Sequence, residues 1–251
     1  MRARLVNSLR ATSQRRWIGA KEEGRIDSKR LYRAVLGIDN FVFKQRTNKI
    51  ALNTVVALAI DHSGSMAGDK LKLAGQSALL IGDVLNSLKI PFMVYGYSTE
   101  ECYRSIPDKS IYARWNSLII TSYRTFSESW ETGARRLATA SRNVQNNTLD
   151  GESVKFGAQQ LLRCPEKRKI LIVFNDGMPY PGSGYVGRGQ HYLKNVVQSV
   201  SDAGVEVIGF GIQDASVRTY YPNNVVIRDL RELVKQPLQT LDSLLRKGVK
   251  L

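Results

Sequence analysis

Residues 55–65 read VVALAIDHSGS, an apolar run joined directly to a short polar one. The length and β-branched content of residues 55–60 predict a buried strand. The spacing D-x-S-x-S then places one carboxylate and two hydroxyls, those of Asp61, Ser63 and Ser65, on the turn that leaves this strand. Because alternate residues of extended backbone point to the same side, their oxygens can converge on one point. Oxygen ligands with little formal charge suit Mg²⁺, and Mn²⁺ accepts the same set.

A second buried strand is predicted at residues 170–174, which read ILIVF and run into Asn175, Asp176 and Gly177. Parallel α/β sheets gather ligands at the carboxyl ends of their strands, near a topological switch point. Two strand ends that each carry an aspartate are what a metal site there requires. Each motif also has a simpler interpretation, because Asp, Ser and Gly dominate ordinary turns and Asp176 could cap a helix.

The rest of the chain predicts one α/β domain with an extension. Residues 1–49 are expected to form a basic N-terminal extension packed on the main domain. It has no strong strand, with short helices expected at residues 5–17 and 29–36 and a short strand at residues 41–43. Residues 50–251 alternate between strand and helix patterns, which favours a mostly parallel sheet covered by helices on both faces. The further strands are expected at residues 91–97, 205–212 and 225–227, and the helices at residues 70–88, 127–140, 146–162, 191–203 and 231–246.

Charge and composition restrict the partners and the compartment. The 251 residues carry a formal net charge of +15, much of it before the first predicted strand. An acidic protein or a nucleic acid would suit that charge, and so would a solvated basic face with no partner. No apolar run reaches the ~18 residues of a membrane span, and the N-terminus lacks a secretory signal. Cys102 and Cys164 do not have the spacing of a disulfide framework or a zinc site. We therefore expect a cytoplasmic protein that does not contact membranes.

Enzymatic and nucleotide-binding functions find little support. No histidine or paired carboxylates stand where a general base is needed, so no catalytic residue is assigned. His62 stands at an x position of the D-x-S-x-S motif, so its side chain is expected to point away from an ion. Residues 181–189 read PGSGYVGRG, which matches neither a phosphate loop nor a dinucleotide fingerprint. A flexible loop beside the metal site is expected there, with Gly182–Gly189 in no assigned role.

These motifs together carry a resemblance to a known family. The D-x-S-x-S turn resembles the metal-ion-dependent adhesion site (MIDAS) of von Willebrand A (VWA) domains. The motif order over nearly the whole chain resembles the C-terminal part of the CobT-type subunit of aerobic cobalt chelatase. The matching elements are Arg16-Trp17, Glu22-Glu23-Gly24, Asp27, Arg30-Leu31, Asp61-x-Ser63-Gly64-Ser65-Met66, Asp150-Gly151-Glu152, Pro165 to Leu171, Asp176-Gly177-x-Pro179, Gly209-Phe210-Gly211-Ile212 and Tyr220-Tyr221.

The resemblance implies a ligand set. Asp61, Ser63, Ser65 and Asp176 match MIDAS positions, and Thr148 stands where the threonine ligand of generic VWA domains would lie. Asp150 is the reserve candidate, either as a ligand itself or as a hydrogen-bond acceptor for one. Helix capping is the simpler interpretation of Thr148 and Asp150, because free N–H groups at a helix start need acceptors.

The resemblance also implies a function. Domains of this family are metal-binding adaptors that work with a MoxR-type AAA+ ATPase, and the pair drives a large chelatase subunit that inserts Co²⁺ into a corrin ring. We therefore expect a Mg²⁺-binding adaptor, not catalytic alone, whose ion meets an acidic side chain of the ATPase, the large subunit or another client. The alternative is a nucleic-acid-binding VWA module that uses the basic segment, where Trp17 stands amid Arg15, Arg16 and Lys21.

Overall fold

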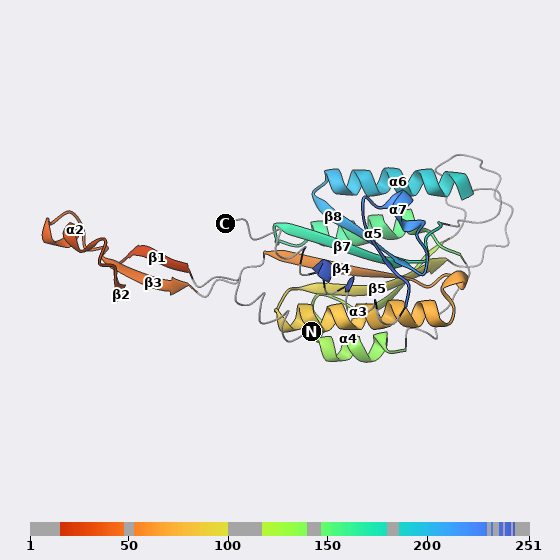
Figure 1. Ribbon diagram of the computed structural model, residues 1–251, viewed down its shortest axis with the longest axis horizontal. Helices are drawn as coiled ribbons and strands as arrows, with labels where there is room; N and C mark the ends of the chain where they lie inside the picture. The colour runs from red at the N-terminus through yellow and green to blue at the C-terminus, as the bar shows by residue number, and fades with distance from the viewer. Residues whose placement is uncertain are drawn as a thin grey trace.

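A computed structural model of the chain describes residues 16–47, 53–99, 117–139, 147–179 and 186–229, together with residues 232, 236, 237, 239–241 and 243. Its main part is a six-stranded sheet of order β6-β5-β4-β7-β8-β9 (Figure 1). Neighbouring strands are parallel except for β6, which runs antiparallel to β5. The strands are β4 (Thr54–Asp61), β5 (Phe92–Thr99), β6 (Leu118–Arg124), β7 (Arg168–Asn175), β8 (Val205–Ile212) and β9 (Asn223–Ile227).

Helices cover both faces of this sheet, which confirms the predicted α/β architecture. In Figure 1, α3 and α4 lie along one face, whereas α5, α6 and α7 lie along the other. A 3₁₀ turn, η1, connects β4 to α3. Their bounds are η1 (Gly64–Met66), α3 (Asp69–Ser87), α4 (Trp130–Leu137), α5 (Asp150–Leu162), α6 (Val186–Asp202) and α7 (Val217–Tyr220).

The sequence of β4 explains why it lies at the centre. Every residue from Thr54 to Asp61 is buried. Val56, Leu58 and Ile60 pack into the core on the α3 side, and the alternate residues between them pack on the α5 side. A strand buried on both faces reads as a continuous apolar run and not as an alternating one. From β4 the chain pairs first with β5 on one side and later with β7 on the other, so the β4–β7 boundary is a topological switch point.

Two details of the main domain differ from the expectations. Residues 118–120, which the sequence leaves open between helix and strand, belong to β6. Helix α6 begins at Val186 and not at His191, so residues 186–189 of the expected flexible loop are helical. The short helix α7 is not predicted at all, because four residues carry no usable periodicity. Residues 181–185 and most of the 231–246 helix lie outside the described residues.

In its described residues the N-terminal extension contains three strands, whereas only one short strand, at residues 41–43, was expected there. β1 (Arg16–Lys21), β2 (Arg25–Ile26) and β3 (Phe43–Thr47) form an antiparallel sheet of order β1-β3-β2. These short strands carry many charged residues and no clean apolar alternation, so their pattern is weak. α2 (Leu31–Val35) lies within the expected helix at residues 29–36.

Several large apolar side chains of this extension are exposed. Seven exposed large side chains lie in it, namely Ile26, Leu31, Tyr32, Val35, Leu36, Ile38 and Phe41. The packing of the extension on the main domain stays a prediction. Of the helix expected at residues 5–17, residues 5–15 lie outside the described residues, and Arg16 and Trp17 belong to strand β1 instead. Within the part of the chain that the structure describes, no helix combines the length and the apolar character needed to cross a bilayer.

Candidate metal centre

The parallel pairing of β4 with β7 brings the two aspartate-bearing strand ends together. The register pairs Ile60 with Phe174, so Asp61 and Asp176 both lie just beyond the paired residues at the same edge of the sheet. Asp61 is almost fully buried, and Asp176 is 8% exposed. The strand ends meet as the sequence predicts.

A chain of hydrogen bonds joins four of the predicted ligands. Oδ1 of Asp61 accepts the backbone N–H of Ser63 at 2.8 Å, and Oδ2 accepts the Ser63 hydroxyl at 3.0 Å. The hydroxyls of Ser63 and Ser65 lie 3.0 Å apart. Ser65 in turn donates its hydroxyl to Oδ1 of Asp176 at 3.0 Å. Two carboxylates and two hydroxyls therefore converge within hydrogen-bonding distance, although 111 residues separate Ser65 from Asp176.

Thr148 lies in a second group, at the start of α5. Its hydroxyl donates to Oδ2 of Asp150 at 3.0 Å. Oδ1 of Asp150 accepts the Tyr97 hydroxyl at 2.6 Å and the Asn175 amide at 3.3 Å. The N-cap residue of α5 is Leu149, and the described part of the chain places no side-chain hydrogen bond on this helix start. The capping interpretation of Thr148 and Asp150 therefore has no hydrogen bond to support it. Among the described residues, no hydrogen bond links Thr148 directly to the first group.

Electrostatics connect the two groups. Burial raises the pKa of the Asp61 carboxyl well above its usual range, and the negative charges of Asp150 and Asp176 raise it further. Burial likewise raises the pKa of Asp150, against the hydrogen bonds from Tyr97, Asn175 and Thr148, which lower it. A buried carboxylate is stable only when a cation or hydrogen bonds compensate its charge. Three aspartates this close therefore create a site that favours a positive charge.

Lys70 supplies one such charge. Its ammonium group lies 2.8 Å from Oδ2 of Asp176, and it is the cation that the described part of the chain places against these carboxylates. The side chain of Lys70 is 30% exposed, whereas that of Asp176 is 8% exposed. The ammonium group of Lys70 therefore lies on the outer side of the cluster.

The donor set fits a hard divalent ion. Mg²⁺ binds oxygen ligands and uses only one or two carboxylates, which hydroxyls and water complete. Oδ1 of Asn175 is buried, and the structure records no hydrogen-bond partner for it among the described residues. Within those residues there is no group of three or more His, Cys, Asp or Glu side chains suited to a metal. The candidate centre instead depends on hydroxyls, which is why its signal lies in the D-x-S-x-S spacing.

His62 turns toward the neighbouring strands. Its Nε2 lies 3.2 Å from the Tyr123 hydroxyl of β6, and its ring packs against Gly96 of β5 so closely that a Cβ at Gly96 would clash with it. Burial lowers the pKa of His62 to about 4. This placement agrees with the expectation that the side chain points away from the ion.

Sequence reasoning missed three contributors to the centre: Lys70, Tyr97 and Asn175. Tyr97 is the register partner of Asp61 across β4 and β5. A polar atom at the carboxyl end of a third strand, beside the switch point, is the signal that could have indicated it. Asn175 likewise ends β7 directly before Asp176. Nothing local in the sequence indicates Lys70, because its partner is 106 residues away.

The family follows from comparison with known proteins. The sequence profile of the cobalamin biosynthesis protein CobT VWA domain matches residues 42–246. This chain belongs to that family. The CobT-type VWA domain is 23% identical over 235 residues to the uncharacterized protein YojO of Bacillus subtilis (strain 168). That match covers 90% of this chain and 35% of YojO, so the chain spans about a third of the length of its curated relative.

Solved structures agree on the fold. The PilB minor pilin from Streptococcus sanguinis superimposes with a TM-score of 0.60 at 13% identity, over 82% of this chain and 65% of that one. The conserved hypothetical protein BatB from Bacteroides thetaiotaomicron gives 0.52 at 14% identity, over 77% and 99%. The SpRpn10 VWA domain gives 0.51 at 12% identity, over 74% and 94%. At such low identities the likeness establishes the VWA fold of the CobT-type domain and nothing finer.

Proposed function

We propose that this CobT-type VWA domain is a Mg²⁺-dependent adaptor. Asp61, Ser63, Ser65 and Asp176 would hold the ion, with Thr148 joining from the start of α5. Mn²⁺ would bind the same oxygens. When bound, the ion supplies a Lewis-acid position at which a carboxylate of a partner protein can bind. The observation that carries the proposal is the hydrogen-bond chain from Asp61 through Ser63 and Ser65 to Asp176.

The chain's own residues would position the contact and relay it. Asp61 fixes the Ser63 turn through two hydrogen bonds, and this turn leads through η1 into α3 on one face of the sheet. Asp150 fixes Thr148 and begins α5 on the other face. A partner bound between the two groups would therefore contact elements from both layers. Relative movement of α3 and α5 is the means by which the adaptor would pass a signal to or from its partner.

The partners proposed are a MoxR-type AAA+ ATPase and a large chelatase subunit or another client, in the cytoplasm. This part of the proposal rests on membership in the CobT family. Cobalt would then be cargo of the assembly and not an ion of this site. No role as an enzyme alone is proposed, because the buried carboxyls of Asp61 and Asp150 are committed to hydrogen bonds within the site.

Metal binding is tested by titrating Mg²⁺ and Mn²⁺ into the full chain by isothermal calorimetry after EDTA treatment. Ser65 is exposed, so Ser65→Ala removes a donor without opening the core. We expect wild type to bind one ion and Ser65→Ala and Asp61→Asn to lose most of the affinity. Asp69→Asn is the matched control, because Asp69 is an exposed carboxylate in the first turn of α3. Equal binding by all four proteins would overturn the assignment.

The adaptor role is tested by recovery of partners from native cytosol. Wild type and Asp61→Ala are immobilised and washed with Mg²⁺ or with EDTA. We expect an AAA+ ATPase to be retained by wild type in Mg²⁺ alone. If the ATPase is retained equally in Mg²⁺ and in EDTA, and equally by wild type and Asp61→Ala, the metal centre does not carry the interaction.

Nucleic-acid binding is a second candidate, because the extension gathers basic residues on a small sheet. The register pairs Trp17 with Arg46 and Arg25 with Lys44. Lys44 also lies 3.9 Å from Asp27, which offsets part of its charge. Binding to polyuridylate that weakens steeply as the salt concentration rises, and that EDTA does not change, would favour nucleic-acid binding over the adaptor role.

A further inference from the structure

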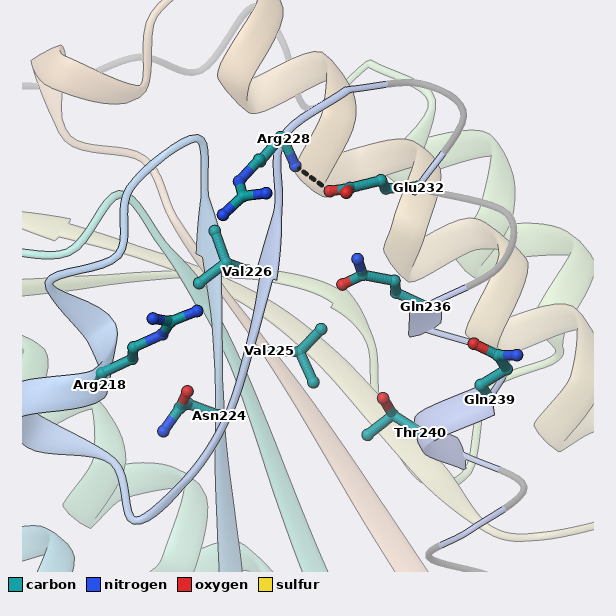
Figure 2. A pocket seen from close by; sticks show the side chains of 9 residues that line it. All are labelled: Arg218, Asn224, Val225, Val226, Arg228, Glu232, Gln236, Gln239 and Thr240. Carbon is teal, nitrogen blue, oxygen red and sulfur yellow. Dashed lines mark hydrogen bonds between the residues drawn. The ribbon is translucent and has the colours of Figure 1, made fainter.

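A groove of about 370 Å³ runs beside β9, the edge strand of the main sheet (Figure 2). The neighbouring residues Val225 and Val226 both line it, although alternate strand residues point to opposite faces. Val225 packs with the α3-side core and Val226 with the α5-side core. A cavity that reaches both side chains must therefore lie along the open edge of the strand and not on one face of the sheet.

Two residues of β9 direct their backbone polar groups toward this groove. The carbonyl of Ile227 accepts the N–H of Gln213, which follows β8, so Ile227 and Val225 direct their backbone groups toward β8. Because this direction alternates along a strand, Asn224 and Val226 direct theirs outward. Within the described residues, the structure records no backbone partner on that side for either one. An edge strand of this kind is a template for another strand.

Glu232 marks where the open edge ends. Its carboxylate accepts the backbone N–H of Arg228 at 2.8 Å, directly after β9 (Figure 2). Arg228 is the next outward-facing residue after Val226. The carboxylate therefore takes the place that an additional strand would otherwise take at this position, and the available pairing length is restricted to residues 224–226.

The charges around the groove favour an acidic occupant. Arg218 of α7 and Arg228 both line it with exposed side chains, and Figure 2 shows their guanidinium groups on the same side of β9, near Val226. Among the described residues that line the groove, Glu232 is the only acidic one, and its carboxylate is committed to a backbone N–H. On the opposite side, Gln236, Gln239 and Thr240 offer uncharged hydrogen-bonding groups.

We propose that the open edge of β9 binds an extended acidic segment of a partner protein, which adds to the sheet as a further strand. Main-chain hydrogen bonds to Asn224 and Val226 would give the geometry, and Arg218 and Arg228 would select acidic side chains. A strand fits this edge better than a phosphate does, because each outward residue offers a carbonyl acceptor beside its N–H donor. The site is separate from the metal centre and works without it.

The probe is a fluorescein-labelled octapeptide of alternating Glu and Val, compared with its Lys and Val counterpart. Binding is followed by fluorescence anisotropy with the full chain in EDTA, so that metal binding plays no part. We expect the acidic peptide alone to bind, and the double variant Arg218→Glu/Arg228→Glu to bind at least about tenfold more weakly. The matched control is Arg163→Glu/Lys167→Glu, which reverses two exposed charges beyond α5.

Strand addition is separated from general attraction by two further measurements. Hydrogen exchange should slow at the amides of Asn224 and Val226 when the acidic peptide is bound. Val226→Pro removes one outward N–H and leaves the groups that face β8, so it should weaken binding without charge change. Absence of binding, binding without amide protection, or equal loss in the control variant would each overturn the proposal. Displacement of the peptide by polyuridylate without amide protection would assign the groove to nucleic acid instead.

Discussion

The ammonium group of Lys70 lies 2.8 Å from Oδ2 of Asp176, on the carboxylate whose other oxygen accepts the Ser65 hydroxyl. Lys70 stands in the first turn of α3, directly beyond the loop that carries the serines. One carboxylate thus joins the second strand end to both the loop and the helix. The same ion pair places a fixed positive charge beside the oxygens that are proposed to hold Mg²⁺.

Replacing Lys70 should therefore strengthen metal binding. Lys70→Met keeps most of the side-chain length and removes the charge. In this variant no ammonium group competes with a divalent ion for Asp176 or repels it. We expect Mg²⁺ to bind about two- to tenfold more tightly, the range that a partly exposed charge allows. Calorimetry measures this. Lys72→Met, an exposed lysine of the same helix, should leave the affinity unchanged, and an unchanged or weaker affinity in Lys70→Met would contradict the prediction.

Substitutions at Thr148 distinguish a residue that binds the ion from one that only donates a hydrogen bond to Asp150. If its hydroxyl binds the ion, Thr148→Val should weaken Mg²⁺ binding by about tenfold or more, whereas Thr148→Ser should retain it. Valine has nearly the same shape, so the loss would come from the missing oxygen. Denaturation curves of all three proteins in EDTA provide the control for folding. Wild-type affinity in Thr148→Val would limit its role to the 3.0 Å hydrogen bond with Asp150 and would remove it from the ligand set.

The buried tyrosines of β5 allow a matched comparison of hydrogen-bond strength. Tyr97 donates to the Asp150 carboxyl at 2.6 Å, and Tyr95 donates to the Ser153 carbonyl at 2.9 Å. Both side chains are fully buried. We expect Tyr97→Phe to lower the free energy of unfolding by about 1.5–3 kcal/mol and Tyr95→Phe by about 1 kcal/mol, because bonds to charged groups are stronger. Urea denaturation in EDTA measures both, and a smaller loss in Tyr97→Phe would show that Asp150 is neutral.

The sequence predicts the sheet and its metal-binding edge because those features are local. β4 and β7 each contain a continuous apolar run, and the D-x-S-x-S or N-D-G turn follows the strand directly. In β8 only Glu206 interrupts the apolar residues. Parallel pairing then brings Asp61 and Asp176 together without further information. The sheet of β1, β2 and β3 is not predicted, because charged residues interrupt the apolar pattern of its strands.

The parts of the centre that the sequence does not predict depend on pairs that are distant along the chain. Lys70 and Asp176 are 106 residues apart, and Tyr97 and Asp150 are 53 apart. Each residue has an ordinary interpretation on its own, as a helix-surface lysine or a strand tyrosine. Only the packing of α3 and α5 against the strand ends shows which polar groups meet.

Two glycines test how closely the neighbourhood of the metal centre is packed. At Gly96 an added Cβ would clash with the His62 ring, whereas at Gly75 of α3 there is open space within 4 Å. Gly96→Ala should therefore lower the free energy of unfolding by about 1–3 kcal/mol, because the ring has to move against Tyr123. Gly75→Ala should raise it by about 0.4–1 kcal/mol, since alanine restricts the unfolded chain and favours the helix. Urea denaturation of both variants decides this. Equal effects would mean that His62 can be displaced freely, and that it does not hold the Asp61 turn against β5.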